Sequence, residues 1–143
     1  MTKVFLDSNV IFDFFAERKP FDKEAEEIME LAYFKSIELF CSAVSYTTLF
    51  HQLSELSGKQ KAFLAIKDMS NLISTVSVNG QIINKALESD HPNMEDSILL
   101  ECATTITDLF AFVTSNPKHF KNKDLVILTP KEFLEAFNLS VHE

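Results

Sequence analysis

Four oxygen-bearing residues in this chain lie where a short apolar segment ends or an expected helix begins. Asp7 directly follows the apolar residues 4–6, and Asn116 follows a second apolar stretch. Glu95 and Asp96 lie in the first turn of an expected helix. Such oxygens are the ligands that hard cations prefer, and a phosphodiester bound to a cation is open to attack by an activated water. These residue types therefore indicate phosphoryl hydrolysis as the candidate chemistry.

The scarcity of glycine excludes the common phosphate-binding loops. The chain of 143 residues holds two glycines, Gly58 and Gly80, whereas average usage is about 7%. The dinucleotide-binding fingerprint needs three closely spaced glycines, and the P-loop needs two with a following Lys. If this protein binds phosphate, it does so by another device, such as a cation held by carboxylates.

Length and composition predict one folded domain that spans residues 1–143. Hydrophobic residues make up 46% of the chain, and no low-complexity segment interrupts it. Compact domains commonly run to about 100–150 residues. Thirteen Lys and Arg against twenty-one Asp and Glu give a net charge of −8. That charge disfavours non-specific binding to nucleic acid, unless cations or a local basic patch intervene.

Five basic residues flank the segments of Asp7 and Asn116. They would form a basic rim beside the site, although a solvated charged face is the more common role of such residues. They are Arg18, Lys19, Lys118, Lys121 and Lys123.

The chain carries no pattern typical of membrane or secreted proteins. No apolar run approaches the roughly 18 residues of a membrane span, and no signal-peptide pattern precedes the first apolar segment. We therefore expect a cytoplasmic protein without membrane contact. Cys41 and Cys102 form no CxxC or Cys/His cluster, which predicts buried reduced thiols.

Apolar periodicity and turn residues predict strands that alternate with helices. Strands are expected at residues 3–6, 37–41, 73–78, 110–114 and 125–128. Helices are expected from residue 8, and at residues 22–34, 45–56, 59–72, 80–88, 94–105 and 130–137. This alternation predicts an α/β fold, a three-layer α/β/α sandwich with a mostly parallel central sheet. Ligands of such sheets bind at the carboxyl ends of the strands, where the strand order reverses.

Four segments in chain order match a known pattern. Residues 4–13 (VFLDSNVIFD) form its opening, and residues 41–45 (CSAVS) its second strand and following helix start. Residues 94–98 (MEDSI) form a central acidic helix. Residues 112–120 (FVTSNPKHF) form a strand that ends in Thr-x-Asn and is followed by Phe. Together the segments resemble the PIN-domain family, which includes toxin nucleases of bacterial toxin–antitoxin pairs, over nearly the whole chain.

The resemblance implies a PIN-like sandwich and a metal-dependent endoribonuclease that hydrolyses RNA phosphodiester bonds. By this resemblance Asp7, Asp96 and Asn116 are the catalytic residues. The same three residues and Glu95 line a pocket for one or two Mg²⁺ or Mn²⁺ ions. The resemblance also makes RNA the expected substrate. An antitoxin-like protein and a second copy of the chain are the partners that it suggests.

Three positions depart from the family pattern. Thr48 stands where many members carry a Glu in the helix after the second strand. Asn116 replaces the Asp found in some members, and His119 stands where an Asp often precedes the Phe. Fewer carboxylates predict weaker binding of hard cations. The alternative function is therefore a catalytically degenerate PIN-like domain that binds a protein or an RNA.

The candidate residues also have purely structural interpretations. Asp7 can cap the helix that follows it. Glu95 and Asp96 suit a helix N-terminus because their charge complements the helix dipole. Asn116 before a proline is a common turn residue, and Asp13 can simply pair with Arg18.

Overall fold

The strands of this computed structural model form one parallel sheet. The structure describes residues 1–142, so residue 143 of the expected domain lies outside the described residues. Within residues 1–142, all strand pairs are parallel and the strand order is β3-β2-β1-β4-β5. The strands are β1 (Thr2–Leu6), β2 (Ile37–Ser42), β3 (Ile73–Val76), β4 (Leu109–Val113) and β5 (Ile127–Leu128).

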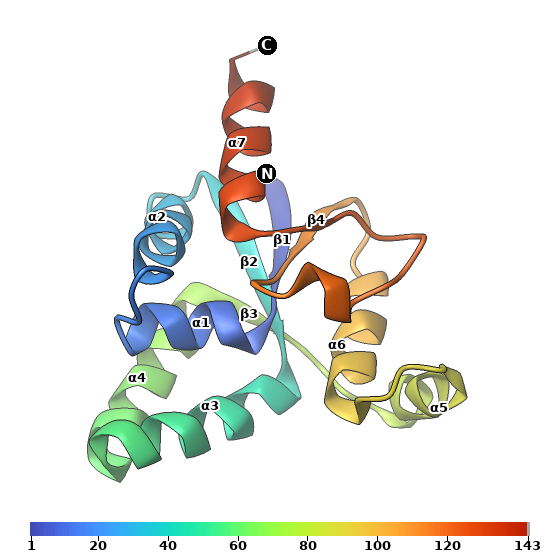
Figure 1. Ribbon diagram of the computed structural model, residues 1–143, viewed down its shortest axis with the longest axis horizontal. Coiled ribbons are helices and arrows are strands. Elements are labelled where there is room, and N and C mark those ends of the chain that lie inside the picture. The colour runs from blue at the N-terminus through green and yellow to red at the C-terminus, as the bar shows by residue number, and fades with distance from the viewer. Residues whose placement is uncertain (143) are drawn as a thin grey trace.

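Helices connect the strands and cover both faces of the sheet (Figure 1). They are α1 (Ser8–Phe15), α2 (Asp22–Tyr33), α3 (Ala43–Ser57), α4 (Lys59–Leu72), α5 (Gly80–Glu88), α6 (Met94–Thr104) and α7 (Pro130–Val141), and a short 3-10 helix, η1 (Pro117–His119), follows β4. The expected three-layer α/β/α sandwich with a parallel sheet is confirmed.

Alternating side chains of β1 divide the core between the two faces of the sheet. Val4 and Leu6 pack with α1, α2, α3, α4 and α7 on one face. Phe5 points to the other face, where α5 and α6 lie. Figure 1 shows this division, with α5 and α6 alone on their side of the strands. Because every side chain of β1 from Val4 to Leu6 is fully buried, the strand is held in place from both sides.

The strand order reverses between β1 and β4. The chain runs outward from β1 through β2 to β3 and then returns to place β4 on the opposite side of β1. A crevice at the carboxyl ends of the strands is the usual ligand site at such a reversal. The residues that follow β1 and β4 therefore meet at the favoured edge of the sheet.

Several element boundaries differ from those expected, and three of these differences have a physical explanation. Strand β5 begins at Ile127 because the residues before it form a turn, in which the Asp124 N–H donates to Asn122 Oδ1. Strand β3 ends at Val76, whose partner Ser42 is the last residue of β2. Helix α7 continues to Val141 although Val141 is exposed, so apolar periodicity could not reveal its last turn.

Two further expectations concern the cysteines and the membrane. Cys41 and Cys102 are both free and buried, which confirms the expected thiols. Across residues 1–142, no helix combines the length and the apolar character that crossing a membrane requires.

On the α5–α6 side of the core, we expect truncation of Phe112 to lower the stability of the protein most. Its ring lies 5.3 Å from that of Phe5 and 4.8 Å from that of Phe120, measured between centroids. Phe112→Ala should lower the free energy of unfolding by about 3–5 kcal/mol, because it leaves a cavity. Phe63→Ala, at a side chain that is 56% exposed, is the control and should change it by about 0.5 kcal/mol or less. Equal effects in urea unfolding would contradict this description of the core.

Candidate active site

Asp7 is a buried carboxylate at the carboxyl end of β1. It is 2% exposed, although it directly precedes α1. Its side chain makes no capping hydrogen bond to α1 within the described residues, so the structural interpretation as a helix cap is not supported. Instead, the Thr114 hydroxyl donates to Asp7 Oδ2 over 2.7 Å. The carboxylate is thus held across the sheet, from the end of the neighbouring strand β4.

Thr114 joins Asp7 to the loop that carries Asn116. The Asn116 N–H donates to Thr114 Oγ1 over 3.0 Å, and the same hydroxyl donates to Asp7. Thr114 itself is fully buried. The Asn116 side chain is exposed, and among the described residues no hydrogen bond links it to Asp7 or Asp96. Asn116 therefore contributes to the described site through its backbone.

The acidic residues of α6 approach the same edge from the other side of the sheet. Asn93 caps this helix, since its side-chain oxygen accepts from the Asp96 N–H over 3.0 Å. Glu95 and Asp96 follow in the first turn, and both are half-buried. The cap fixes the residue at which α6 begins. It therefore also fixes the side of this helix on which Asp96 lies.

Thr48 of α3 contacts this acidic turn. Its hydroxyl donates to Glu95 Oε1 over 2.5 Å. The residue that replaces the expected glutamate therefore lies against a carboxylate of the candidate site. A hydroxyl can donate to a carboxylate, whereas a second carboxylate would repel it.

Burial and neighbouring carboxylates raise the pKa of Asp7 and of Asp96. Burial raises the pKa of Asp7 to about 6, the Thr114 hydroxyl and the Asn9 N–H oppose this shift, and Asp96 and Glu95 add to it. The Asn9 N–H has this effect although it lacks the geometry of a capping hydrogen bond. Negative charge is therefore concentrated at a partly buried position, where it is costly to leave unpaired.

Burial also raises the pKa of Asp96, and Glu95 raises it further. His91 and His119 act in the opposite direction. Among the ion pairs of residues 1–142, none joins a Lys or Arg to Asp7, Glu95 or Asp96.

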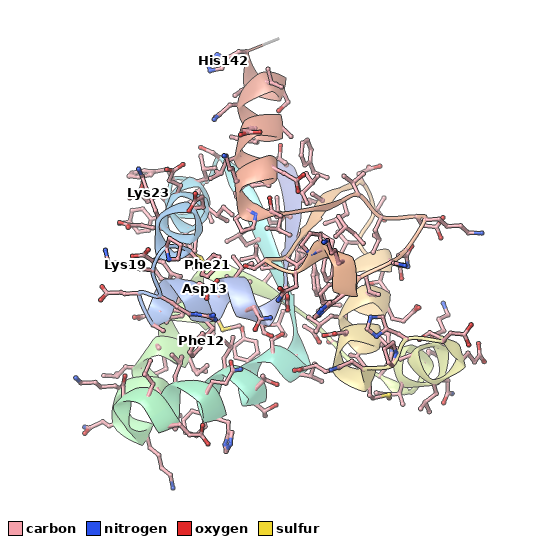
Figure 2. The ribbon with its side chains drawn as sticks, in the orientation of Figure 1. Phe12, Asp13, Lys19, Phe21, Lys23 and His142 are labelled. Atoms are coloured by element: carbon pink, nitrogen blue, oxygen red, sulfur yellow. The ribbon has the colours of Figure 1, made fainter. Side chains whose placement is uncertain are left out.

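Asp13 is a buried carboxylate with a different environment. Arg18 lies 3.6 Å from its Oδ1, and the Ser115 hydroxyl donates to its Oδ2 over 3.4 Å. Figure 2 shows Asp13 on α1, near the connection to α2 that holds Phe21. The expected pairing of Asp13 with Arg18 is confirmed. Asp13 therefore has its own cation, which Asp7 lacks.

The donors at the edge fit a hard cation that keeps part of its water. In the described part of the chain, no three His, Cys, Asp or Glu side chains are grouped so that they could hold a metal ion. Mg²⁺ commonly binds to proteins through one or two carboxylates, with water and substrate phosphate as the other ligands. Asp7 and Asp96 offer such a pair, and their charge is not neutralised by Lys or Arg. Water or substrate would have to complete the coordination.

Two features of the site were not expected from the sequence. The sequence did not show whether Thr114 contacts the site or only satisfies local backbone groups. Its place in the Thr-x-Asn segment was the one signal for a role in the site. The histidines next to Asp96 share no metal-binding spacing in the sequence, and only the fold brings His91 and His119 to one carboxylate.

Comparison with known proteins identifies a family model and a similar protein. A family model described as PIN domain matches residues 3–117. The chain is also similar to "Ribonuclease VapC1" of Aquifex aeolicus (strain VF5). The two are 29% identical over 141 residues, which cover 95% of this chain and 96% of that protein.

Solved structures share the fold at low sequence identity. A toxin–antitoxin complex from Klebsiella pneumoniae contains a chain that matches with a TM-score of 0.65 and 18% identity, covering 89% of this chain and 97% of that chain. VapBC2 from Rickettsia felis, bound to a DNA fragment from its promoter, matches with a TM-score of 0.67 and 14% identity, covering 88% and 97%. At these identities the likeness establishes the fold. Because the family model matches residues 3–117, which is most of the chain, this chain belongs to the PIN domain family.

Proposed function

We propose that this protein is a metal-dependent endoribonuclease that hydrolyses RNA phosphodiester bonds with Mg²⁺ or Mn²⁺. The observation that carries the proposal is the unneutralised acidic cluster at the reversal of strand order, formed by Asp7, Asp96 and Glu95. Asp7 is nearly fully buried, and among the described residues no Lys or Arg forms an ion pair with it. A bound cation would neutralise its charge.

The residues of the chain have separate roles in this proposal. Asp7 and Asp96 hold the cation, and Glu95 and Asn116 assist through water. Thr114 keeps the Asp7 carboxylate in one orientation because it donates to one of its oxygens. When bound, the cation would neutralise charge on the phosphodiester and activate the attacking water.

The relatives support the substrate and a protein partner. The Aquifex aeolicus relative is named a ribonuclease, and two of the solved neighbours are described as toxin–antitoxin or VapBC structures. We therefore propose RNA as substrate and an antitoxin-like protein as partner, within the cytoplasm. A homodimer is a further assembly that the family resemblance suggests.

A catalytically degenerate PIN-like binding module is the second candidate. It is favoured by Thr48 in place of a family glutamate and by the lack of a three-residue ligand group among residues 1–142. The two functions differ in RNA cleavage and in the need for a divalent cation, since the binding module neither cleaves RNA nor needs the cation.

Asp96→Asn tests the cation site directly. We expect it to weaken Mn²⁺ binding, followed by calorimetry, by about tenfold or more, since it removes one of few charged ligands. Cleavage of a single-stranded RNA should fall with it. Asp68→Asn changes an exposed carboxylate of α4 and is the matched control. Equal Mn²⁺ affinity of Asp96→Asn and the unchanged protein would eliminate the proposed site.

Thr48→Glu should tighten Mn²⁺ binding severalfold. Position 48 contacts Glu95, so the new carboxylate would add negative charge beside the proposed ligands, and cation affinity rises with ligand charge. Thr47→Glu adds the same charge one residue earlier, at an exposed position, and should leave the affinity unchanged. If calorimetry shows the same Mn²⁺ affinity for both variants, position 48 does not face the cation.

Asp7 should make the metal-free protein less stable as the pH rises. The pKa of this carboxyl is raised from 3.8 to about 6 in the folded state, so the folded state binds the proton more tightly than the unfolded state. Its stabilising contribution is therefore present at low pH and lost as the pH rises through about 6. The difference between the two pKa values corresponds to about 3 kcal/mol in the free energy of unfolding.

Urea unfolding with a chelator, at about pH 4 and about pH 7.5, measures this loss. Asp7→Asn should show a smaller loss than the unchanged protein, and Asp68→Asn should show the full loss. Mn²⁺ should restore stability at the higher pH only where Asp7 is present. A pH dependence that Asp7→Asn leaves unaltered would refute the assignment.

A further inference from the structure

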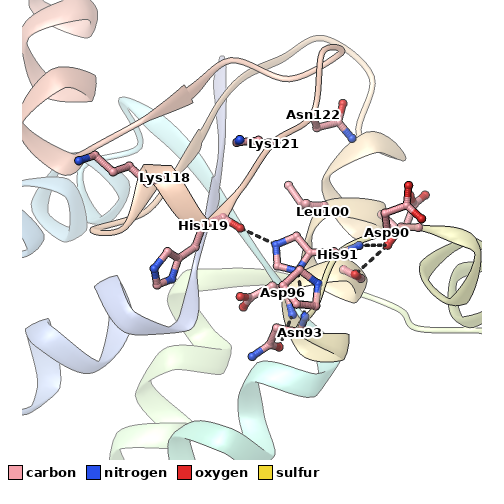
Figure 3. A pocket seen from close by; sticks show the side chains of 13 residues that line it. Asp90, His91, Asn93, Asp96, Leu100, Lys118, His119, Lys121 and Asn122 are labelled. Atoms are coloured by element: carbon pink, nitrogen blue, oxygen red, sulfur yellow. Dashed lines mark hydrogen bonds between the residues drawn. The ribbon is translucent and has the colours of Figure 1, made fainter.

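A pocket of about 620 Å³ opens beside Asp96. One wall is formed by the loop before α6 and by the α6 side chains Asp96, Leu100 and Glu101. The opposite wall is the segment 118–122, which follows β4 (Figure 3). Pockets that bind small organic molecules commonly measure about 300–1,000 Å³. The space is therefore sufficient for one nucleotide, at a position next to the proposed cation.

One hydrogen bond joins the two walls of the pocket, and two others lie within the wall formed by α6 and the loop before it. The Asn93 N–H donates to His91 Nδ1 over 3.1 Å, and His91 Nε2 donates to the carbonyl oxygen of His119 on the opposite wall. Figure 3 shows this bond crossing between the two segments. The Ser89 and Ser97 hydroxyls are hydrogen-bonded to each other over 2.9 Å. The walls are thus preorganised, which reduces the entropy lost on binding.

The segment 115–123 is locally basic in an acidic protein. It carries Lys118, Lys121 and Lys123 and contains no Asp or Glu, whereas the net charge of the chain is −8. Lys118 and Lys121 are exposed, and Figure 3 shows Lys118 directed away from His91. Lysines on the rim are suited to contact the phosphates of a nucleic-acid strand that passes outside the pocket. They are less suited to contact a group bound inside it.

The interior of the pocket offers contacts for a base. Leu100 is an apolar side chain that a base could cover, and Asn122 carries an amide on the opposite wall. Glu101 is half-buried on α6, and among the described residues its carboxylate has no ion-pair partner. Carboxylates accept hydrogen bonds from base amino groups, as Glu and Asp do from cytosine N4. An unpaired base can present both its face and its edge to such a pocket.

We propose that this pocket binds one unpaired nucleotide of a single-stranded RNA, next to the phosphodiester at Asp96, while Lys121 contacts a flanking phosphate. The inference rests on the proposed ribonuclease function and adds its substrate subsite. Glu101 accepts a hydrogen bond from the base. RNA in a continuous duplex cannot insert a base here, so the strand must be single-stranded at this point.

The test compares RNA binding with and without individual bases. Affinities are measured by fluorescence anisotropy for a short labelled single-stranded RNA, and for the same RNA with an abasic nucleotide at each position in turn. A chelator is present, so that cleavage does not interfere. The proteins are the unchanged chain, Glu101→Ala, Lys121→Ala and the control Lys61→Ala, an exposed lysine of α4. Thermal unfolding checks that each variant is folded.

Two results are expected. One abasic position should weaken binding to the unchanged protein about fivefold or more, as the loss of a stacked base does, and this penalty should shrink in Glu101→Ala. Lys121→Ala should weaken binding at every RNA sequence and reduce the slope of log affinity against log salt by about 0.7. Lys61→Ala should do neither.

The subsite is refuted if no abasic position weakens binding, or if the penalty is the same in Glu101→Ala as in the unchanged protein. It is also refuted if Lys121→Ala keeps the salt slope of Lys61→Ala, as it would if the pocket served a protein partner. Failure of the ribonuclease proposal gives a different result. RNA cleavage with Mn²⁺ would then be absent in the unchanged protein, whatever the binding measurements show.

Discussion

The burial of Asp7 is the constraint on which the candidate site depends. A carboxylate that is 2% exposed and beside other acids is costly to ionise. The Thr114 hydroxyl donates to it over 2.7 Å and the Ser8 hydroxyl over 3.5 Å, and within residues 1–142 no Lys or Arg forms an ion pair with it. Asp13 shows that the same fold can supply a cation to a buried acid, since Arg18 lies beside it. The difference between the two acids is the physical basis for assigning Asp7 to function.

The topology brings the remaining groups to this carboxylate. Because the strand order reverses between β1 and β4, Asp7 and Thr114 follow adjacent strands and can meet. The Asn93 cap then starts α6 so that Asp96 approaches the same edge. The pocket on the far side of Asp96 continues this edge toward a basic segment. In the proposed function, this sheet edge combines a place for a cation with a path for a polyanion.

Much of this arrangement could be predicted from local sequence features. The apolar run before Asp7 indicated a buried strand, and the acidic turn at Asp96 indicated a helix start, so both positions at the sheet edge could be predicted. Contacts between distant segments could not be predicted. Thr48 and Glu95 are 47 residues apart, and His91 and His119 are 28 apart, and no periodicity links such positions. For Asn116, the sequence could not distinguish a contribution of its side chain from one of its backbone.

The central claim is that the acids at the ends of β1 and α6 hold a divalent cation. Anomalous diffraction from crystals soaked in Mn²⁺ tests it most directly, because the ion is located without reference to activity. The account predicts an anomalous peak within coordination distance of the carboxylates of Asp7 and Asp96. A well-ordered crystal with no peak at this edge, or with Mn²⁺ bound only elsewhere, would contradict it.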